Sequence, residues 1–142
     1  MRYEESSLLL RVRPNDLDSL GHVNNATVLE YLEAGRWAWM ELHSLRRGGS
    51  IIAVTIRIEV DYRREIAPQE VLVRTRLEAP SPSELHEEGA IHYRVRFRQQ
   101  IFVDSGRVLA VEAHVEAACI NAADRSLRPV QEYIAMARMP AP

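Results

Sequence analysis

Residues 26–49 read ATVLEYLEAGRWAWMELHSLRRGG and form the longest helical pattern in the chain. Apolar or small residues recur there at spacings of three and four, the period of one helix face: Val28, Leu32, Gly35, Ala38, Leu42 and Leu45. Trp37, Trp39 and Met40 widen this apolar surface, which predicts a helix buried on most sides. A glycine inside a helix costs up to about 1 kcal/mol relative to alanine. We therefore interpret Gly35 as a point of close contact between the helix and a sheet.

Signals for both ends of a helix flank this pattern. Thr27 and Glu30 have the spacing of a capping box, and Asn25 is an alternative N-cap slightly earlier. Gly48 and Gly49 follow two arginines, a composition typical of a helix C-terminus. These signals predict a helix that begins near Asn25 and continues to the glycine pair.

Most of the remaining chain alternates apolar and polar residues with a period of two, which indicates half-buried strands. The predicted strands occupy residues 8–13, 52–63, 71–77, 91–98 and 111–119. The clearest strand directs five apolar side chains to one face: Val54, Ile56, Ile58, Val60 and Tyr62. A loop is expected at 79–83, a hairpin turn at DSGR (104–107) and a short terminal helix from Pro129 to Met139. Strands joined by short turns pair antiparallel.

This order of elements predicts an α+β architecture. One well-buried helix packed against one antiparallel sheet is the economical arrangement for a strand, a long helix and further strands. This arrangement resembles the hot-dog fold, in which a curved sheet wraps around a central helix. We expect residues 1–142 to form a single hot-dog domain with about five strands.

Length and composition limit the classes of protein that the chain can represent. A chain of 142 residues buries about 68–70% of its unfolded surface, enough for a substantial core. The net charge of −2 does not favour nucleic acid or an anionic membrane as a partner. A single cysteine, Cys119, suits a reducing compartment. The N-terminus is too charged for a signal peptide, and no apolar run approaches membrane-spanning length. We expect a soluble, cytoplasmic protein.

The stretch NDLDSLGHVNN, residues 15–25, precedes the helix and is rich in small polar residues. It contains two carboxylates, one imidazole, one glycine and three asparagines. Taken alone, Asp16 and Asp18 are residues of a turn, and Asn24 and Asn25 are residues of a helix entry. A catalytic role is the alternative explanation for the polar composition of residues 15–25.

The longer segment RPNDLDSLGHVNNATVLEYLEAGR, residues 13–36, resembles the signature of hot-dog thioesterases of the 4-hydroxybenzoyl-CoA thioesterase-like group. The matching parts are Asp18, the Gly-His-Val-Asn-Asn run at 21–25, and Glu33 with Arg36. The order and lengths of the elements agree in outline over the whole chain. Hot-dog hydratases and dehydratases place aromatic and proline residues where Val23 to Asn25 stand, so that reaction class is disfavoured.

The resemblance implies a thioester hydrolase that converts acyl-CoA and water to a free acid and coenzyme A. It places the catalytic carboxylate at Asp18 and not at Asp16, which stays a turn residue. Asp18 either acts as a general base toward water or attacks the thioester itself. The backbone N–H of Asn25, at the electropositive start of the helix, is the expected donor to the oxyanion. His22 either takes part in catalysis or organises the loop.

Three further residues are candidates for substrate binding. Gly21 lets the chain bend closely past the substrate. Asn24 could hold water or the Asp18 carboxylate, and Tyr62 lies at the end of its strand. No metal site or cofactor is expected, because the other histidines lack the spacing of metal ligands: His43, His86, His92 and His114.

Several questions stay open at the level of sequence. Seven arginines on the predicted outer face either belong to a solvated surface of mixed charge or contact CoA phosphates: Arg57, Arg63, Arg74, Arg76, Arg94, Arg96 and Arg98. The acyl group is undetermined, and four residues either line its pocket or pack in the core: Tyr31, Trp37, Trp39 and Met40. Acyl-ACP is an alternative carrier, and a non-catalytic acyl-CoA-binding module is the alternative function. Exposed sheet edges predict at least a homodimer, and the resemblance implies a dimer with active sites at its interface that is often doubled to a homotetramer.

Overall fold

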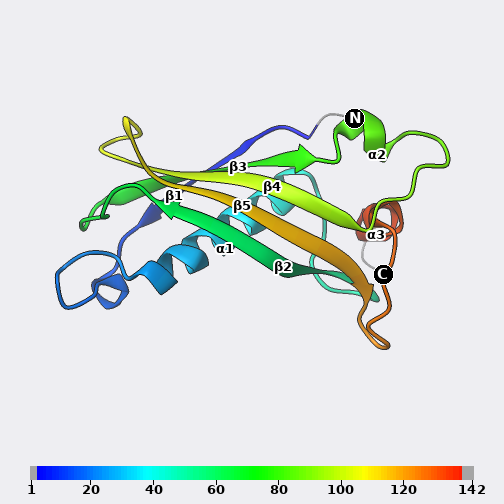
Figure 1. The fold of residues 1–142 in the computed structure, drawn as a ribbon, viewed down its shortest axis with the longest axis horizontal. Helices are drawn as coiled ribbons and strands as arrows, with labels where there is room; N and C mark the ends of the chain where they lie inside the picture. Colours follow the sequence, from blue (N-terminus) through cyan, green and yellow to red (C-terminus); the bar gives the residue numbers. More distant parts are fainter. Residues whose placement is uncertain (1–2, 139–142) are drawn as a thin grey trace.

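A computed structural model describes residues 3–138, in which one curved sheet wraps around a long helix (Figure 1). The strands are β1 (Ser6–Arg11), β2 (Ile51–Tyr62), β3 (Glu70–Ala79), β4 (Arg94–Val103) and β5 (Val108–Asn121). The helical elements are the 3-10 turn η1 (Pro14–Asp16), α1 (Asn25–Leu42), α2 (Pro82–Leu85) and α3 (Val130–Ala137). The five strands are antiparallel in the order β1-β3-β4-β5-β2. The expected α+β hot-dog arrangement is confirmed.

Several boundaries differ from those predicted. The first strand is Ser6–Arg11 instead of 8–13, and the fourth begins at Arg94 instead of residue 91. The expected loop at 79–83 leads into the short helix α2. The turn at 104–107 is confirmed, with Gly106 at a φ of 83°. The terminal helix is α3, and the predicted end at Met139 lies outside the described residues.

The order of strands in the sheet is not a simple run of hairpins. β2 pairs with β5 and not with β3, although only residues 63–69 separate β2 from β3. This connection therefore runs from β2, at one edge of the sheet, past β5 and β4 to β3, which lies next to the opposite edge strand. Its Ile66 is buried in the core, and its backbone C=O accepts a hydrogen bond of 2.8 Å from the Val23 N–H. The crossing brings residues 63–66 next to the N-terminal end of α1.

The C-terminal end of α1 comes earlier than the glycine pair predicts. The helix ends at Leu42, because Ser44 adopts a left-handed φ of 57°. The Ser44 N–H donates to the Glu41 C=O (3.0 Å), and the Leu45 N–H donates to the Met40 C=O (2.8 Å). These two bonds form a Schellman motif in which serine takes the position that glycine usually holds. Gly48 lies beyond the helix end.

One side of α1 is buried against the sheet, and the other side faces solvent. The side chains of Trp37 and Leu42 are 44% and 53% exposed, so the prediction that the helix is buried on most sides is wrong. The buried residues of the helix are Val28, Tyr31, Leu32, Gly35, Arg36 and Trp39. Trp37 and Leu42 therefore widen the apolar pattern of the helix sequence but do not pack in the core.

A layer of polar side chains divides the core between α1 and the sheet into two apolar clusters. Gln99 is fully buried, and its side-chain N–H donates to the Leu32 C=O and to the Thr75 hydroxyl, both at 2.8 Å. Arg36 donates to Gln99 Oε1 at 3.0 Å. Val28, Leu32 and Ile101 belong to the cluster nearer the start of α1, and Trp39 and Phe97 belong to the other.

Gly35 lies against this polar layer. A Cβ atom at Gly35 would come within 2.6 Å of Val73 Cγ1 and 2.9 Å of Thr75 Oγ1. Real Cβ atoms do not approach other atoms so closely, so the helix would have to move away from the sheet. The interpretation of Gly35 as a point of close helix–sheet contact is confirmed.

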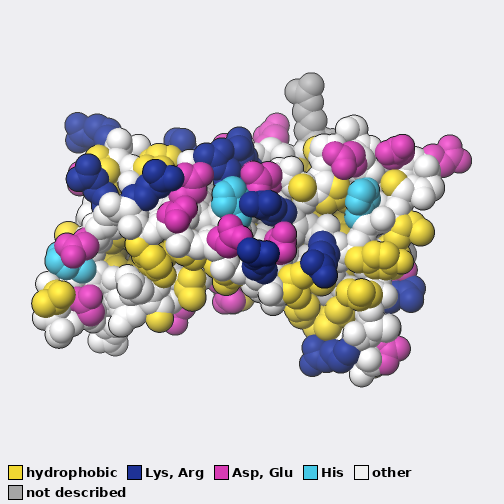
Figure 2. Space-filling view, in the orientation of Figure 1, with side chains coloured by type: hydrophobic (Ala, Val, Ile, Leu, Met, Phe, Trp, Pro, Cys, Tyr) yellow, Lys and Arg dark blue, Asp and Glu magenta, His cyan; other side chains and the backbone are white. Residues whose placement is uncertain are grey.

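The outer face of the sheet carries the mixed charge that the sequence predicts. Figure 2 shows basic, acidic and histidine side chains intermingled over the middle of the sheet. Glu112 pairs with Arg98 (2.8 Å) and Arg63 (3.2 Å), while Glu78 pairs with Arg96 (3.0 Å) and His114 (3.1 Å). Ion pairs at a protein surface contribute about 0–1 kcal/mol each, so these pairs add little to the stability of the fold.

Substitution of Gly35 tests the contact between α1 and the sheet. Alanine has the better helix propensity by about 1 kcal/mol, yet we expect Gly35→Ala to lower the free energy of unfolding by about 1–3 kcal/mol through overpacking. Chemical denaturation measures the change. Ala34→Gly, at the preceding helical position, is the control and should lose about 1 kcal/mol from propensity. A Gly35→Ala protein at least as stable as wild type would contradict the close contact.

Candidate active site

The loop of residues 17–24 leads directly into α1 and is closed on itself by backbone hydrogen bonds. Leu17 and Val23 form an antiparallel bridge, and the Asp18 N–H donates to the His22 C=O at 2.7 Å. Gly21 lies at the turn with a φ of 82°, a conformation that favours glycine. A Cβ atom at Gly21 would meet no atom within 4 Å. The glycine therefore serves the backbone conformation of the loop.

The Asp18 carboxylate is exposed and is oriented by its own loop. Its Oδ1 accepts hydrogen bonds from the backbone N–H groups of Leu20 (2.9 Å) and His22 (3.2 Å). No donor within residues 3–138 contacts Oδ2. One oxygen thus fixes the carboxylate, and the other is available to a water molecule or a substrate.

Asp18 lines a cleft of about 310 Å³ at the start of α1. Four of the residues proposed from the sequence line it: Asp18, His22, Asn25 and Tyr62. The other lining residues are Val23, Val28, Arg63, Arg64, Glu65, Ile66 and Val111. Gly21 and Asn24, also proposed from the sequence, act in the loop and in the helix cap and do not line the cleft.

The N-terminus of α1 opens into this cleft. Its N-cap is Asn24, whose side-chain oxygen accepts the Ala26 N–H at 2.8 Å. The sequence predicts the N-cap at Asn25 or at the Thr27–Glu30 capping box. Both predictions are wrong, because the N-cap is one residue or more earlier. Because Asn25 is the first helical residue, its N–H has no intrahelical acceptor, and none is found among residues 3–138. That N–H is positioned to serve an external oxygen.

Two side-chain contacts complete the walls of the cleft. The Tyr62 hydroxyl donates to the Asn25 C=O at 2.8 Å and so joins the end of β2 to the start of α1. The His22 imidazole faces Glu65, with 3.3 Å between Nε2 and Oε2. His22 therefore contacts the β2–β3 connection, while its backbone positions Asp18.

Comparison with known proteins identifies the family. Residues 12–140, which include the loop and all the residues that line the cleft, match one of the known protein-family profiles. The chain belongs to the thioesterase-like superfamily. It is 35% identical over 75 residues to the long-chain acyl-CoA thioesterase FadM of Escherichia coli (strain K12), a match that covers 46% of this chain and 52% of FadM. The chain thus spans about half the length of this curated relative.

Solved structures share the fold of this thioesterase-like chain. A 1,4-dihydroxy-2-naphthoyl-CoA thioesterase from Synechocystis superposes with a TM-score of 0.76 at 16% identity, over 95% of this chain and 96% of that one. A DHNA-CoA thioesterase from Staphylococcus aureus gives a TM-score of 0.72 at 21% identity, over 93% and 85% of the two chains. At these identities the similarity shows the common fold.

The second carboxylate of the loop, Asp16, is buried with an exposed fraction of 3%. Its Oδ2 accepts hydrogen bonds from the Tyr31 hydroxyl (2.7 Å) and the Arg13 backbone N–H (2.9 Å). Its Oδ1 pairs with the Arg13 guanidinium at 3.1 Å, and its backbone C=O accepts the Asn24 N–H at 2.8 Å. Asp16 is a turn residue, as predicted, but it also joins η1, α1 and the N-cap.

The surroundings of Asp16 hold its carboxyl group ionised. Burial alone would raise the pKa of Asp16, but the hydrogen bonds from Arg13 and Tyr31, with the charge of Arg13, lower that pKa below its ordinary value. Burial, together with the hydrogen bond to Asp16 and the charge of that carboxylate, raises the pKa of the Tyr31 phenol well above its usual range. Asp16 is thus a structural anion whose oxygens are already occupied, whereas Asp18 has an unoccupied oxygen.

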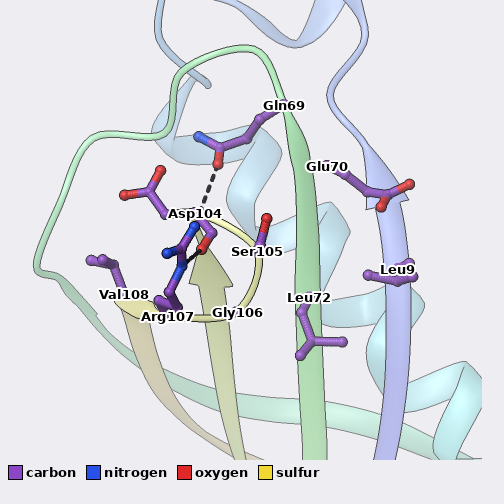
Figure 3. A pocket seen from close by; sticks show the side chains of 9 residues that line it. All are labelled: Leu9, Gln69, Glu70, Leu72, Asp104, Ser105, Gly106, Arg107 and Val108. Carbon is purple, nitrogen blue, oxygen red and sulfur yellow. Dashed lines mark hydrogen bonds between the residues drawn. The ribbon is translucent and has the colours of Figure 1, made fainter.

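Two other hollows in the surface lack these features. An open groove of about 850 Å³ lies beside the turn between β4 and β5 (Figure 3). Two of its polar side chains hold the turn itself, because the Asp104 N–H donates to Gln69 Oε1 (2.9 Å) and Arg107 Nε donates to the Asp104 C=O (3.1 Å). A small apolar cavity of about 50 Å³ beside Trp39 and Phe97 is too small for an acyl chain.

The four residues considered for an acyl pocket have different surroundings. Tyr31 binds Asp16, and Trp37 lies at the surface under the Arg47 guanidinium, 4.0 Å from its ring centroid. Trp39 and Met40 line the small apolar cavity in the other half of the core. None of the four lines the cleft at Asp18.

The Tyr31–Asp16 hydrogen bond predicts a pH-dependent loss of stability. Tyr31→Phe removes a donor to a buried carboxylate, and we expect it to lower the free energy of unfolding by about 1–3 kcal/mol at pH 7. Since the folded pKa of Asp16 is depressed, this contribution is complete above the unfolded pKa of about 3.9 and is lost as the pH falls through the folded pKa. Denaturant titrations from pH 7 to pH 3 measure the difference between variant and wild type.

The control for this prediction is Tyr133→Phe, which removes a hydroxyl that donates to a neutral acceptor, the Arg46 C=O. Its effect should not change between pH 7 and pH 3. A Tyr31→Phe difference that is equally independent of pH would show that Asp16 is not the ionised acceptor.

Proposed function

We propose that the chain hydrolyses acyl-CoA thioesters, with Asp18 as the catalytic carboxylate. The observation that carries the proposal is the exposed Asp18 carboxylate, one oxygen fixed and one unoccupied, in a cleft shared with the open N-terminus of α1. Membership of the thioesterase-like superfamily and the partial match to FadM support the same reaction.

The reaction adds a water oxygen to the thioester carbonyl and releases a thiol. Asp18 either removes a proton from the attacking water or attacks first and forms an anhydride that water then cleaves. In both routes negative charge develops on the carbonyl oxygen. The Asn25 N–H, aided by the partial positive charge at the helix start, donates to that oxygen. The C–S bond then breaks, and the sulfur takes up a proton, from Asp18 in the first route and from water in the second, and leaves as the thiol.

The other residues of the cleft have supporting roles in this proposal. His22 positions Asp18 through its backbone N–H. Tyr62 contacts the substrate and holds the Asn25 peptide, while Val28 and Val111 provide an apolar wall. Gly21 and Asn24 act by shaping the loop and capping the helix. Hydrolysis needs no metal or organic cofactor in this scheme.

The acyl group and its carrier define the substrate more closely. FadM is a long-chain acyl-CoA thioesterase, and two of the structural neighbours act on an aromatic acyl-CoA. A panel of aliphatic and aromatic acyl-CoAs and acyl-ACPs, scored for thiol release as kcat/KM, distinguishes these substrates. Binding without turnover over the whole panel would favour the alternative of a non-catalytic acyl-CoA-binding module.

We also propose that the protein is cytoplasmic and assembles into a homodimer, which could double to a tetramer. β2 is twelve residues long and lies at an edge of the sheet, with Ile56 and Tyr62 44% and 45% exposed. An unprotected edge strand of this length invites pairing with a second copy. Such pairing would place Tyr62, and with it the cleft, next to the partner. No helix within residues 3–138 is long and apolar enough to cross a membrane.

Light scattering at micromolar concentration tests the assembly, and we expect at least a dimer. Ile56→Lys puts a charge on the exposed edge and should shift the protein toward monomer, whereas Leu9→Lys, an exposed site on the β1 edge strand, should not. A wild-type monomer at that concentration would contradict an assembly in which the cleft lies next to a partner subunit.

Asp18→Asn tests the catalytic assignment. Asparagine keeps the size of the side chain and an oxygen for the loop N–H groups but loses basicity and nucleophilicity. We expect kcat to fall by about 10²–10⁴-fold with little change in KM. Thiol release from the best acyl-CoA of the panel measures both constants, and a melting curve confirms folding. Activity within about threefold of wild type in a folded variant would exclude Asp18 as the catalyst.

The matched control is Glu65→Gln, because Glu65 is the second carboxylate that lines the cleft. Its carboxylate faces His22 and is exposed to solvent, so its loss should leave most of the activity. If Glu65→Gln is inactive and Asp18→Asn is active, the catalytic carboxylate lies on the β2–β3 connection instead. Asp16→Asn is unsuitable as a control, since Asp16 is buried and holds the loop.

A further inference from the structure

Two consecutive arginines, Arg63 and Arg64, follow β2 and line the cleft. Their backbones are fixed, because both N–H groups donate to the Ala110 C=O, at 2.8 Å and 3.1 Å. The side chains therefore leave from a defined point at the edge of the cleft. Both residues are exposed.

The charges of the two arginines are used differently. The Arg63 guanidinium pairs with Glu112 on the outer face of the sheet at 3.2 Å. Glu65, the next residue of the connection, faces His22. Arg64 makes no ion pair with any carboxylate among residues 3–138. Of the cations that line the cleft, Arg64 is thus the one whose charge is not neutralised within the described chain.

We propose that Arg64 binds a phosphate group of the acyl carrier, an inference that rests on the proposed function. In an acyl thioester of coenzyme A, a flexible pantetheine arm joins the thioester to the phosphates. When the thioester lies at Asp18, that arm passes out of the cleft, and the phosphates reach its solvent-exposed border. A guanidinium offers two parallel N–H donors to phosphate oxygens and keeps its charge at every physiological pH.

The charges around the cleft fit a substrate whose thioester lies at Asp18 and whose phosphates lie at the border of the cleft. The acidic groups that line it are Asp18, on the loop before α1, and Glu65, which the His22 ring faces. Arg63 is directed to the sheet by Glu112, so among the described residues that line the cleft Arg64 is the arginine left without a carboxylate partner. Since Arg64 is exposed, the attraction is screened by salt and should weaken as ionic strength rises.

The test compares one acyl group on two carriers. Acyl-CoA has the phosphates, and the acyl-pantetheine thioester lacks them but keeps the arm and the thioester. We expect Arg64→Gln to raise KM for acyl-CoA about 5–30-fold with little change in kcat, the scale of one lost charge-assisted hydrogen bond at an exposed site. The constants for acyl-pantetheine should stay within about twofold, a distinction that loss of structure could not produce. Arg64→Lys should recover part of the lost affinity.

Arg74→Gln is the matched control. Arg74 lies on β3, stacks 4.9 Å from the Phe102 ring centroid on the outer face, and does not line the cleft. Its loss makes the net charge more negative by the same amount and should leave the CoA-to-pantetheine ratio of kcat/KM unchanged. An equal change for Arg74→Gln, an equal loss on both carriers, or a change in assembly with Arg64→Gln would each overturn the assignment to phosphate.

Failure of the proposed function gives a different result. If wild type cleaves no thioester, hydrolysis is excluded. Calorimetry with free coenzyme A then still tests Arg64, because the Kd of Arg64→Gln can be compared with the Kd of wild type. If wild type cleaves acyl-CoA and acyl-pantetheine equally well, hydrolysis stands and the phosphate contact is excluded.

Discussion

The buried carboxylate of Asp16 is the constraint on which the geometry of the cleft depends. It accepts hydrogen bonds from the turn before the loop and from Tyr31 on α1, and its backbone C=O binds the N-cap residue Asn24. The loop between these points has little freedom, so Asp18 and the first N–H of α1 are held on one cleft. An ionised buried group with all these partners is stabilising only while they remain, since an unpaired buried charge is costly.

Two aspartates two residues apart thus have opposite environments. The folded chain lowers the pKa of Asp16 by surrounding it with donors, and both of its oxygens are occupied. Asp18 is fixed through one oxygen and exposed at the other. The β2–β3 connection completes the arrangement, because its path across the sheet brings Tyr62, Arg64 and Glu65 to the same place. The cleft is therefore a product of strand order as much as of the loop sequence.

The fold was predictable from the sequence to the extent that periodicity specifies it. Alternation in residues 52–63 and 111–119 predicts both strands, and the cost of Gly35 in a helix predicts close packing that the structure confirms. The single apolar face predicted for residues 52–63 is wrong, because a bulge between Thr55 and Arg57 pairs Val54 with Ala118 and leaves Ile56 44% exposed, while Ile58 and Val60 pack against the core. Alternation does not specify which strands are neighbours, so the pairing of β2 with β5 was missed. The Schellman motif at Ser44 was missed because it lacks the glycine that usually marks it.

The candidate site was predictable only through the motif, and its supporting contacts were not. Asn24 and Asn25 are equivalent as caps in the sequence, and only the path of the loop selects Asn24. The burial of Asp16 depends on Tyr31, fifteen residues away, and no local pattern connects the two. Arg64 has no distinguishing feature in the sequence, since its lack of a carboxylate partner is a property of the folded chain.

The central claim is that Asp18 acts on the transition state and contributes little to holding the substrate. Calorimetric binding of a non-hydrolysable thioether analogue of acyl-CoA to wild type and to Asp18→Asn tests this claim most directly. Removal of a group that acts only in the transition state leaves ground-state binding intact. We expect the Kd values of wild type and Asp18→Asn to agree within about threefold, although the variant has lost turnover. A loss of affinity as large as the loss of turnover would show that Asp18 binds the substrate and that the catalytic group lies elsewhere.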